Sequence, residues 1–259
     1  MADQRVKAFA RAFADVFFPR FCIVCQAPIS HDNPVDLCGD CEKAIALPEG
    51  HYCAKCAAPM GDYATACPNC HGMHLVMNAS AAFGIYDGAL RDRVIEFKFS
   101  SQRYMARTFG ILVARAARKQ WPDVAFDAVT AVALHPGRRR ERGFDQSKAI
   151  ARYTAKSLGV PYMPGLLTRV RATESQVGLT RNARMDNVKG AFQGATGTGV
   201  KSALVVDDIM TTGATLSEAA RALKRAGVKK VFAAVVARTG PDFVSAASDQ
   251  PADMEGQTR

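Results

Sequence analysis

Two adjacent carboxylates, Asp207 and Asp208, stand between an apolar run and a loop rich in threonine and glycine, in the stretch ALVVDDIMTTGAT. Ligands of parallel α/β sheets bind where strands end, and carboxylates accept hydrogen bonds from hydroxyls or bind Mg²⁺. The backbone N–H groups and hydroxyls of the loop favour an anion if a helix begins beside them. The sequence therefore predicts a site for a ligand with both hydroxyls and a phosphate, such as a ribose 5-phosphate. The predicted phosphate loop is Met210, Thr211, Thr212, Gly213, Ala214 and Thr215.

The acidic pair also has a simpler interpretation. One carboxylate would cap the following helix and the other would be a surface charge. The attached loop favours the ligand site over this simpler interpretation. Its glycine lets the backbone approach a ligand closely, and a helix cap does not need that.

All 8 cysteines lie in the first part of the chain, in four Cys-x-x-Cys turns. Each turn aims two sulfurs at one point, and two turns complete the tetrahedral cage of a structural zinc site. Pairing of neighbouring turns is the simplest arrangement, and a cross-braced one satisfies the same spacings. Redox chemistry is less favoured, because it would be expected at one helix start rather than four times. Two zinc ions are predicted, with the ligands Cys22, Cys25, Cys38, Cys41, Cys53, Cys56, Cys67 and Cys70.

Strands and helices alternate from about residue 79. Strands are expected over 79–86, 126–136, 202–209 and 229–239, and helices over 89–121 (one or two), 145–160 and 215–228. This alternation predicts an α/β fold with a parallel sheet and helices on its faces. The run 203–206 is expected to be buried on both sides, the helix after the loop to open at Leu216, and 194–200 to be a flexible link.

The charge of the chain is uneven. The net charge of the 259 residues is +10, yet residues 1–78 carry 6 Lys and Arg against 8 Asp and Glu. Residues 79–259 carry 28 against 16, which predicts an anionic partner for the second part. We divide the chain into an amphipathic helix (1–20), a cysteine module (21–78), an α/β domain (79–240) and a disordered tail (241–259).

The N-terminus is expected to form a short helix with one apolar face, made of Val6, Phe9, Phe13, Val16 and Phe17. This face is expected to pack on the protein itself, with a membrane surface or a partner as the alternative. Charged residues interrupt the apolar core that a secretion signal needs, and no run is long enough to span a bilayer. A cytoplasmic location is therefore predicted, where thiols stay reduced.

The stretch VVDDIMTTGAT closely resembles the signature with which type I phosphoribosyltransferases bind PRPP, 5-phosphoribosyl 1-diphosphate. Over most of its length the chain resembles the ComF family of competence-type proteins. The stretches FFPRFCIVC, HPGRRRERGFDQ and LLTRVRATESQVGLTRNARMDNVKGAF also resemble that family. One departure is Asp145, where the family more often has asparagine. The resemblance implies an α/β, parallel-sheet, type I phosphoribosyltransferase-like domain with a small N-terminal double zinc ribbon.

The resemblance also implies roles for residues. The strand end before a short loop would bind pyrophosphate, which corresponds to His135, Pro136, Gly137 and Arg138. A mobile hood over 138–189 would cover the site. Four arginines stand close together at its start, and such a basic run is usually just a solvated face. Hood candidates are Arg139, Arg140, Arg142 and Gln146, and weaker ones are Arg169, Arg171, Gln176, Arg181 and Arg184. Asp207 and Asp208 would hold the ribose as the catalytic pair.

The leading hypothesis is a phosphoribosyltransferase that transfers ribose 5-phosphate from Mg-PRPP to an unidentified nitrogen acceptor and releases pyrophosphate. One alternative is a non-catalytic PRPP or nucleotide sensor on the same fold. Another is a protein that handles single-stranded DNA during DNA uptake, because the second part is basic. Single-stranded DNA, competence-machinery proteins and a second copy in a homodimer are the further partners that the resemblance allows.

Overall fold

The computed structural model describes residues 17–61, 64, 66–99, 103–134, 144–173 and 180–240. Most of the predicted N-terminal helix, the predicted tail 241–259 and the basic loop 135–142 lie outside the described residues. Within the described part of the chain, no helix is both long enough and apolar enough to cross a membrane.

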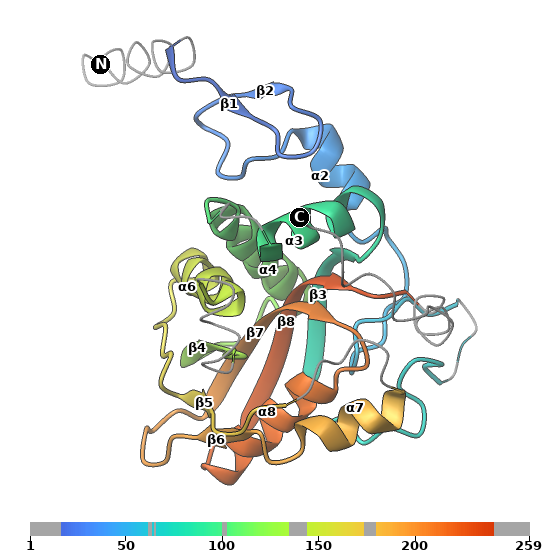
Figure 1. Ribbon diagram of the computed structural model, residues 1–259, viewed down its shortest axis with the longest axis vertical. Coiled ribbons are helices and arrows are strands. Elements are labelled where there is room, and N and C mark those ends of the chain that lie inside the picture. Colours follow the sequence, from blue (N-terminus) through green and yellow to red (C-terminus); the bar gives the residue numbers. More distant parts are fainter. Residues whose placement is uncertain are drawn as a thin grey trace, which may run out of the picture.

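A four-stranded sheet forms the centre of the molecule (Figure 1). All neighbouring strands are parallel. The side chains of β7 from Ala203 to Val206 are fully buried, as expected for a strand covered on both faces. The predicted α/β fold is therefore confirmed. The strand order is β3 (Ala79–Ile85), β8 (Lys230–Arg238), β7 (Ser202–Met210) and β4 (Ala128–Ala131).

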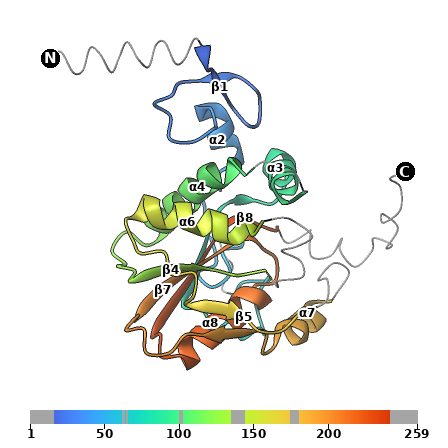
Figure 2. The ribbon, with the colours of Figure 1, turned by 60° about the vertical axis from the view of Figure 1, so that its left-hand side comes forward.

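Helices cover both faces of the sheet, as Figures 1 and 2 show. The segment 89–121 forms two helices, which was one of the two expected arrangements. The longer one ends at Gln120 with Trp121 as its C-cap, before a proline that cannot continue a helix. One face carries α3 (Gly88–Phe99), α4 (Met105–Gln120) and α6 (Gln146–Leu158), and the other carries α8 (Ala214–Arg225).

Within the α/β domain, three short elements were not predicted. An antiparallel pair, β5 (Leu167–Arg169) with β6 (Phe192–Gly194), lies beside α8, and α7 (Arg181–Val188) precedes β6. Strands of 3 residues are too short for an alternating pattern to reveal them. The first residue of the expected flexible link, Gly194, belongs to β6.

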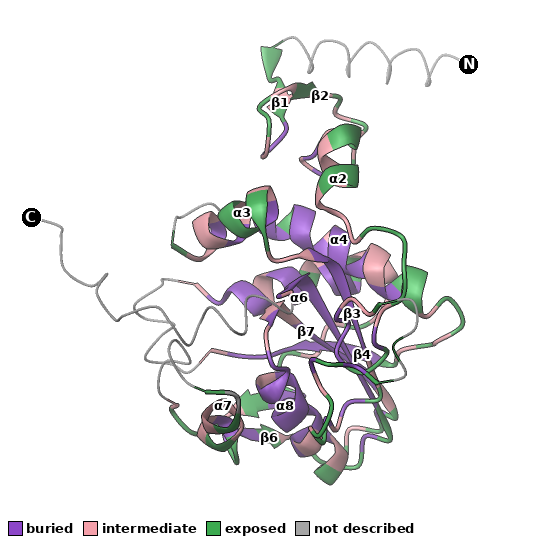
Figure 3. Ribbon diagram, turned by 90° about the vertical axis from the view of Figure 1, so that its right-hand side faces the viewer, coloured by how far each residue is buried: buried purple, intermediate pink, exposed green. Residues whose placement is uncertain are grey.

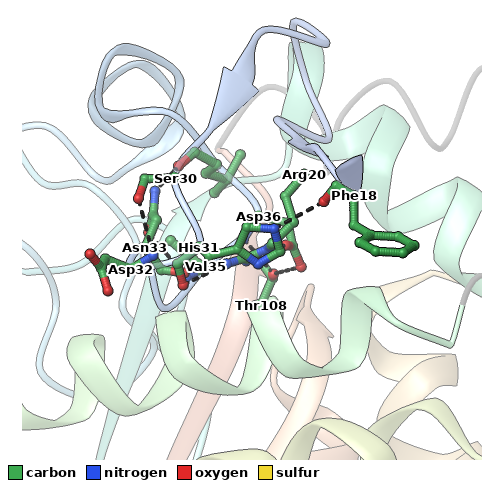
Figure 4. A network of polar contacts seen from close by, with 10 residues as sticks. Phe18, Arg20, Ser30, His31, Asp32, Asn33, Val35, Asp36 and Thr108 are labelled. Carbon is green, nitrogen blue, oxygen red and sulfur yellow. Dashed lines mark hydrogen bonds and ion pairs between the residues drawn. The ribbon is translucent and has the colours of Figure 1, made fainter. Parts of the chain in front are cut away.

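The first cysteine module, with β1 (Arg20–Phe21), β2 (Pro28–Ile29) and α2 (Gly39–Ile45), lies against α3 and α4. Asp36 joins it to α4 (Figure 4). The Thr108 hydroxyl donates to the Asp36 carboxylate at 3.0 Å, and the Asp36 N–H donates to the Thr108 oxygen at 2.9 Å. Arg20 forms an ion pair with the same carboxylate. This network fixes the first module on the helical face.

The second cysteine module, residues 51–77, packs on the opposite face of the sheet. Leu75 and Met77 are buried in one cluster with Val205 and with residues of α8. The Val76 N–H donates to the Ser217 hydroxyl at 3.0 Å, and Lys224 Nζ donates to the Val76 carbonyl at 2.8 Å. Figure 3 shows α8 as a largely buried helix, because this module and the sheet both cover it.

Candidate functional site

The acidic pair lies inside β7 rather than just beyond it. β7 continues to Met210, because β8 runs alongside it as far as Arg238 and supplies ladder partners. Asp207 is paired with Val235 in this ladder. The burial pattern nevertheless changes at the pair, from the fully buried residues before Asp207 to partly exposed ones from Asp207 to Ile209. The carboxylates therefore lie at the carboxyl end of a central strand, where parallel sheets bind ligands.

Asp207 has an environment that disfavours its charge. Its Oδ1 accepts hydrogen bonds from the Ser147 hydroxyl at 2.6 Å and from the Asp208 N–H at 3.0 Å. Burial and the neighbouring Asp208 carboxylate raise the pKa of Asp207 to about 7, while the Ser147 hydroxyl, the Asp208 N–H and Lys98 act in the opposite direction. This carboxylate therefore takes up a proton near neutral pH, where an isolated aspartate stays ionised.

Asp208 has a cationic partner that sequence reasoning missed. Lys98 Nζ, from the last turn of α3, lies 3.0 Å from Asp208 Oδ2, with both side chains largely buried. The Gln146 side chain donates to the Lys98 carbonyl at 3.2 Å and is 1% exposed. Gln146, which was predicted to belong to the mobile hood, is thus a packed residue at the start of α6. Lys98 stands 110 positions before Asp208, so no local sequence pattern could have indicated that the two residues are partners.

Asp145 connects the site to the segment where the pyrophosphate loop was predicted. It caps α6 by accepting the Lys148 N–H at 3.1 Å, and its second oxygen accepts the Leu134 N–H at 3.1 Å. An asparagine has one carbonyl oxygen for the same two donors, so aspartate suits this double role. The residues of the predicted loop and hood, His135, Pro136, Gly137, Arg138, Arg139, Arg140 and Arg142, lie outside the described residues.

The phosphate loop turns sharply from β7 into α8. Gly213 has φ +80, and a Cβ on it would lie 2.5 Å from the Met210 methyl carbon. Thr212 is buried, and its hydroxyl oxygen accepts the Ala214 N–H at 3.3 Å, so this side chain holds the turn. The helix begins at Ala214, two residues before the predicted Leu216. The N–H groups of its first turn have no partners within the helix and favour an anion.

Two of the weaker hood candidates have structural contacts instead. The Arg169 guanidinium lies over the Phe192 ring, 5.4 Å from its centroid. Arg171 donates to the carbonyls of Asn187 and Lys189 at 2.8 and 2.6 Å, which ties β5 to the end of α7. Gln176 lies outside the described residues.

The eight cysteines form two groups, and each group combines neighbouring turns. The sulfurs of Cys25 and Cys38 are 3.7 Å apart in the first group, and those of Cys53 and Cys70 are 3.6 Å apart in the second. Four sulfurs around a tetrahedral zinc with bonds of about 2.3 Å lie about 3.8 Å from one another. Both groups therefore fit a structural zinc ion, and the cross-braced alternative is wrong. No histidine joins either group among the described residues.

Comparisons with known proteins agree with these two parts of the chain. The family model of the double zinc ribbon domain matches residues 13–71, and that of the phosphoribosyl transferase domain matches residues 147–251. Competence protein F of Haemophilus influenzae is 29% identical over 222 residues, which are 83% of this chain and 95% of that protein. The chain thus joins a double zinc ribbon domain to a phosphoribosyl transferase domain. Two other proteins to which the chain is similar are DNA utilization protein YhgH of Escherichia coli K12 and competence protein ComFC of Streptococcus pneumoniae. YhgH is 26% identical over 85% of this chain and 98% of the relative. ComFC is also 26% identical, over 75% of this chain and 84% of the relative.

Solved structures give weaker likenesses to the chain. Orotate phosphoribosyltransferase of Mycobacterium tuberculosis H37Rv matches with a TM-score of 0.32 and 21% identity, over 55% of this chain and 71% of that enzyme. The fold assignment therefore rests on the strand topology and the family models.

The family models leave out the part of the chain that joins the two matched regions. Leu75, Val76 and Met77, which lie under α8, come after the end of the zinc ribbon match. The phosphoribosyl transferase match begins inside α6, so that β3, β4 and Lys98 lie before it. The acidic pair and the whole phosphate loop lie within the match.

Proposed function

We propose that this chain binds Mg-PRPP and transfers its ribose 5-phosphate to a nitrogen acceptor, with release of pyrophosphate. One observation carries the proposal. Two carboxylates lie near the carboxyl end of a buried central strand, and the chain after the strand turns through Gly213 into the N-terminus of a helix. Hydroxyl acceptors thus lie beside an anion cradle, which is the combination that a ribose 5-phosphate requires.

Each group has a proposed role. Asp207 and Asp208 accept the ribose hydroxyls or hold Mg²⁺, for which carboxylate oxygens are suitable ligands. The loop from Met210 to Thr215 binds the 5-phosphate, and His135–Arg138 binds the diphosphate. Lys98 holds the Asp208 carboxylate in position through an ion pair of 3.0 Å.

The proposed reaction needs no covalent intermediate. The C1–O bond to pyrophosphate breaks and the electron pair leaves with pyrophosphate, while the nitrogen lone pair forms the C1–N bond and the nitrogen loses one proton to solvent. The protein would contribute positioning and charge stabilisation, because the transition state gains positive charge at C1. Mg²⁺ would neutralise charge on the leaving diphosphate. A closed hood would exclude water and prevent hydrolysis of PRPP.

The first test is a calorimetric titration of the zinc-loaded chain with PRPP, with and without Mg²⁺. We expect binding that depends on Mg²⁺ and is lost in the double variant Asp207→Ala/Asp208→Ala. The matched control, Asp92→Ala/Asp123→Ala, removes two exposed carboxylates and should bind like the wild type. Absence of binding by the wild type would refute the proposal. Binding would justify a screen of nitrogen bases for pyrophosphate release.

A second candidate function is the handling of single-stranded DNA. It is favoured by the basic charge of residues 79–259 and by the relatives' names, which mention competence and DNA utilization. Strand binding weakens steeply as salt rises, because phosphates release their counterions. A fluorescence titration with an oligonucleotide at several salt concentrations would detect it. PRPP binding without pyrophosphate release from any base would instead favour a nucleotide sensor.

The setting of the proposed reaction follows from its chemistry. A cytoplasmic location is part of the proposal, because reduced thiols are the form that binds zinc. The DNA uptake machinery is the proposed biological context, given the names of the relatives.

A further inference from the structure

A single buried arginine connects the second zinc site to the phosphate loop. Arg238 ends β8 and is 1% exposed. Its Nε donates to the carbonyl of Cys56, a zinc ligand, at 2.7 Å. Its Nη1 donates at 3.0 Å to the carbonyl of Met210, which is the first residue of the phosphate loop. The same carbonyl also accepts the Thr239 N–H at 3.1 Å, so the start of the loop is held by two donors.

The charge of Arg238 points to the zinc site as its counter-ion. Its other contacts are the carbonyl and hydroxyl of Thr239, and no carboxylate pairs with it among the described residues. A buried cation without a partner is costly, whereas a site of four thiolates and one Zn²⁺ carries a net charge of about −2. The hydrogen bond from Arg238 to the Cys56 carbonyl places the guanidinium directly beside this ligand turn.

The same zinc module also forms the floor of the phosphate loop. A Cβ on Gly213 would lie 3.4 Å from Met77 and 3.5 Å from Leu75, so the turn of the loop packs directly on these side chains. The hydrogen bonds of Val76 to Ser217 and Lys224 attach the module to the first and last turns of α8. The phosphate loop and the N-terminus of α8 thus rest on the second zinc module. These are the parts that would hold the phosphate.

We propose that Arg238 is a positioning residue that couples zinc occupancy at Cys53, Cys56, Cys67 and Cys70 to the affinity of the phosphate loop. The identity of the ligand rests on the function proposed above. The coupling itself rests on the contacts of Arg238. Because linkage is reciprocal, zinc in the second site strengthens phosphate binding, and a bound phosphate slows the loss of zinc. The first zinc site lies on the opposite face of the sheet and takes no part.

Variants of Arg238 test the residue in the full zinc-loaded chain. Arg238→Lys keeps the charge but cannot donate along both directions of the guanidinium fork, and Arg238→Met removes the charge. We expect both to raise the Kd for Mg-PRPP at least tenfold in calorimetry. Arg225→Met, an exposed arginine at the end of α8, is the control and should bind like the wild type. Unchanged binding in both Arg238 variants would overturn the proposal.

Reciprocity is tested without changing Arg238, in case its variants do not fold. In Cys25→Ser the first zinc site is broken, so zinc release to a chelator reports the second site. In Cys70→Ser the second site is broken, so zinc release reports the first site. We expect PRPP to slow zinc release at least threefold in Cys25→Ser and to leave the rate in Cys70→Ser unchanged. Equal rates with and without PRPP in Cys25→Ser, at saturating PRPP, would contradict the coupling.

Hydrogen exchange separates the failure of the inference from the failure of the proposed function. Amide exchange over residues 210–216 is measured without PRPP, before and after zinc is removed from Cys25→Ser. We expect exchange to become at least tenfold faster when zinc leaves the second site. If PRPP does not bind the wild type but this change occurs, the function fails and the coupling stands. If PRPP binds and exchange is unchanged by zinc removal, the coupling fails and the function stands.

Discussion

The two carboxylates of the acidic pair are unequal. Asp208 forms an ion pair with Lys98, 3.0 Å away. Asp207 lies beside Asp208, and burial and this negative charge raise its pKa to about 7. A carboxylate with a raised pKa holds a proton in the folded chain that the unfolded chain has already lost. In the proposed site, we expect the pair to bind ligand hydroxyls or a cation best at a pH above about 7, where Asp207 is ionised.

The raised pKa of Asp207 predicts a pH-dependent cost in stability. Between the ordinary value of 3.8 and about 7 the folded state binds more protons, so this group lowers the free energy of unfolding as pH rises, with its full effect above about 7. Asp207→Asn keeps an oxygen for Ser147 and removes the charge. We expect its Tm to exceed that of the wild type at pH 8 by at least about 3 °C, the shift from about 1 kcal/mol in a chain of this size, and to match it near pH 4.

Asp127 is the control for this measurement, because its shift has the opposite sign. The N–H groups of Ser202 and Lys201 hold the pKa of Asp127 below its usual value, so its ionised form stabilises the fold above that value. Asp127→Asn should therefore lower the Tm at pH 8. A Tm of Asp207→Asn equal to or below that of the wild type at pH 8 would contradict the predicted cost.

At the scale of elements, the connection from β7 to α8 decides the shape of the candidate site. The strand ends at Met210 and the helix begins at Ala214, so the chain must reverse within three residues. The left-handed conformation of Gly213 makes this turn possible, because a residue with a Cβ reaches it only with strain. The helix N-terminus is thereby brought next to the acidic pair, with the second zinc module beneath.

Gly213→Ala should disrupt the phosphate loop. Its backbone conformation costs an L-residue about 1–2 kcal/mol, and the new Cβ would press on Met210. Gly199→Ala is the matched control, since Gly199 has φ +73 with open space around it. We expect both variants to lose stability in urea unfolding, and Gly213→Ala alone to lose PRPP binding in calorimetry. Equal PRPP affinities of the two variants would show that the turn does not shape the site.

At the scale of the whole molecule, the two zinc modules have different surroundings. Cys22 packs with α3 and α4 on one face of the sheet, whereas Cys53 and Cys56 pack with α8 on the other. In the first site Cys25 is exposed. In the second site three of the four cysteines are buried. The second module is thus part of the α/β core, although its cysteines belong to the same sequence pattern as the first.

These surroundings predict two rates of zinc loss. A chelator should remove zinc quickly from the exposed first site and slowly from the second, because the second opens only when the packing against α8 loosens. We expect two phases in a dye assay for released zinc, with the slow phase accompanied by loss of near-ultraviolet circular dichroism. The Cys25→Ser variant should lack the fast phase. A single phase, or a fast phase that persists in this variant, would contradict the difference between the sites.

The sequence alone determined the features whose residues are neighbours along the chain. Four Cys-x-x-Cys turns indicated two thiolate sites, and Asp207 and Asp208 before a threonine- and glycine-rich loop indicated the ligand chemistry. Their spacings are local, and local geometry follows from them directly. Only the tertiary structure showed that Lys98 pairs with Asp208, that Ser147 donates to Asp207, and that Arg238 joins Cys56 to Met210. These partners are separated by up to 182 residues, and packing of the helices and zinc modules on the sheet, which no local spacing encodes, brings them together.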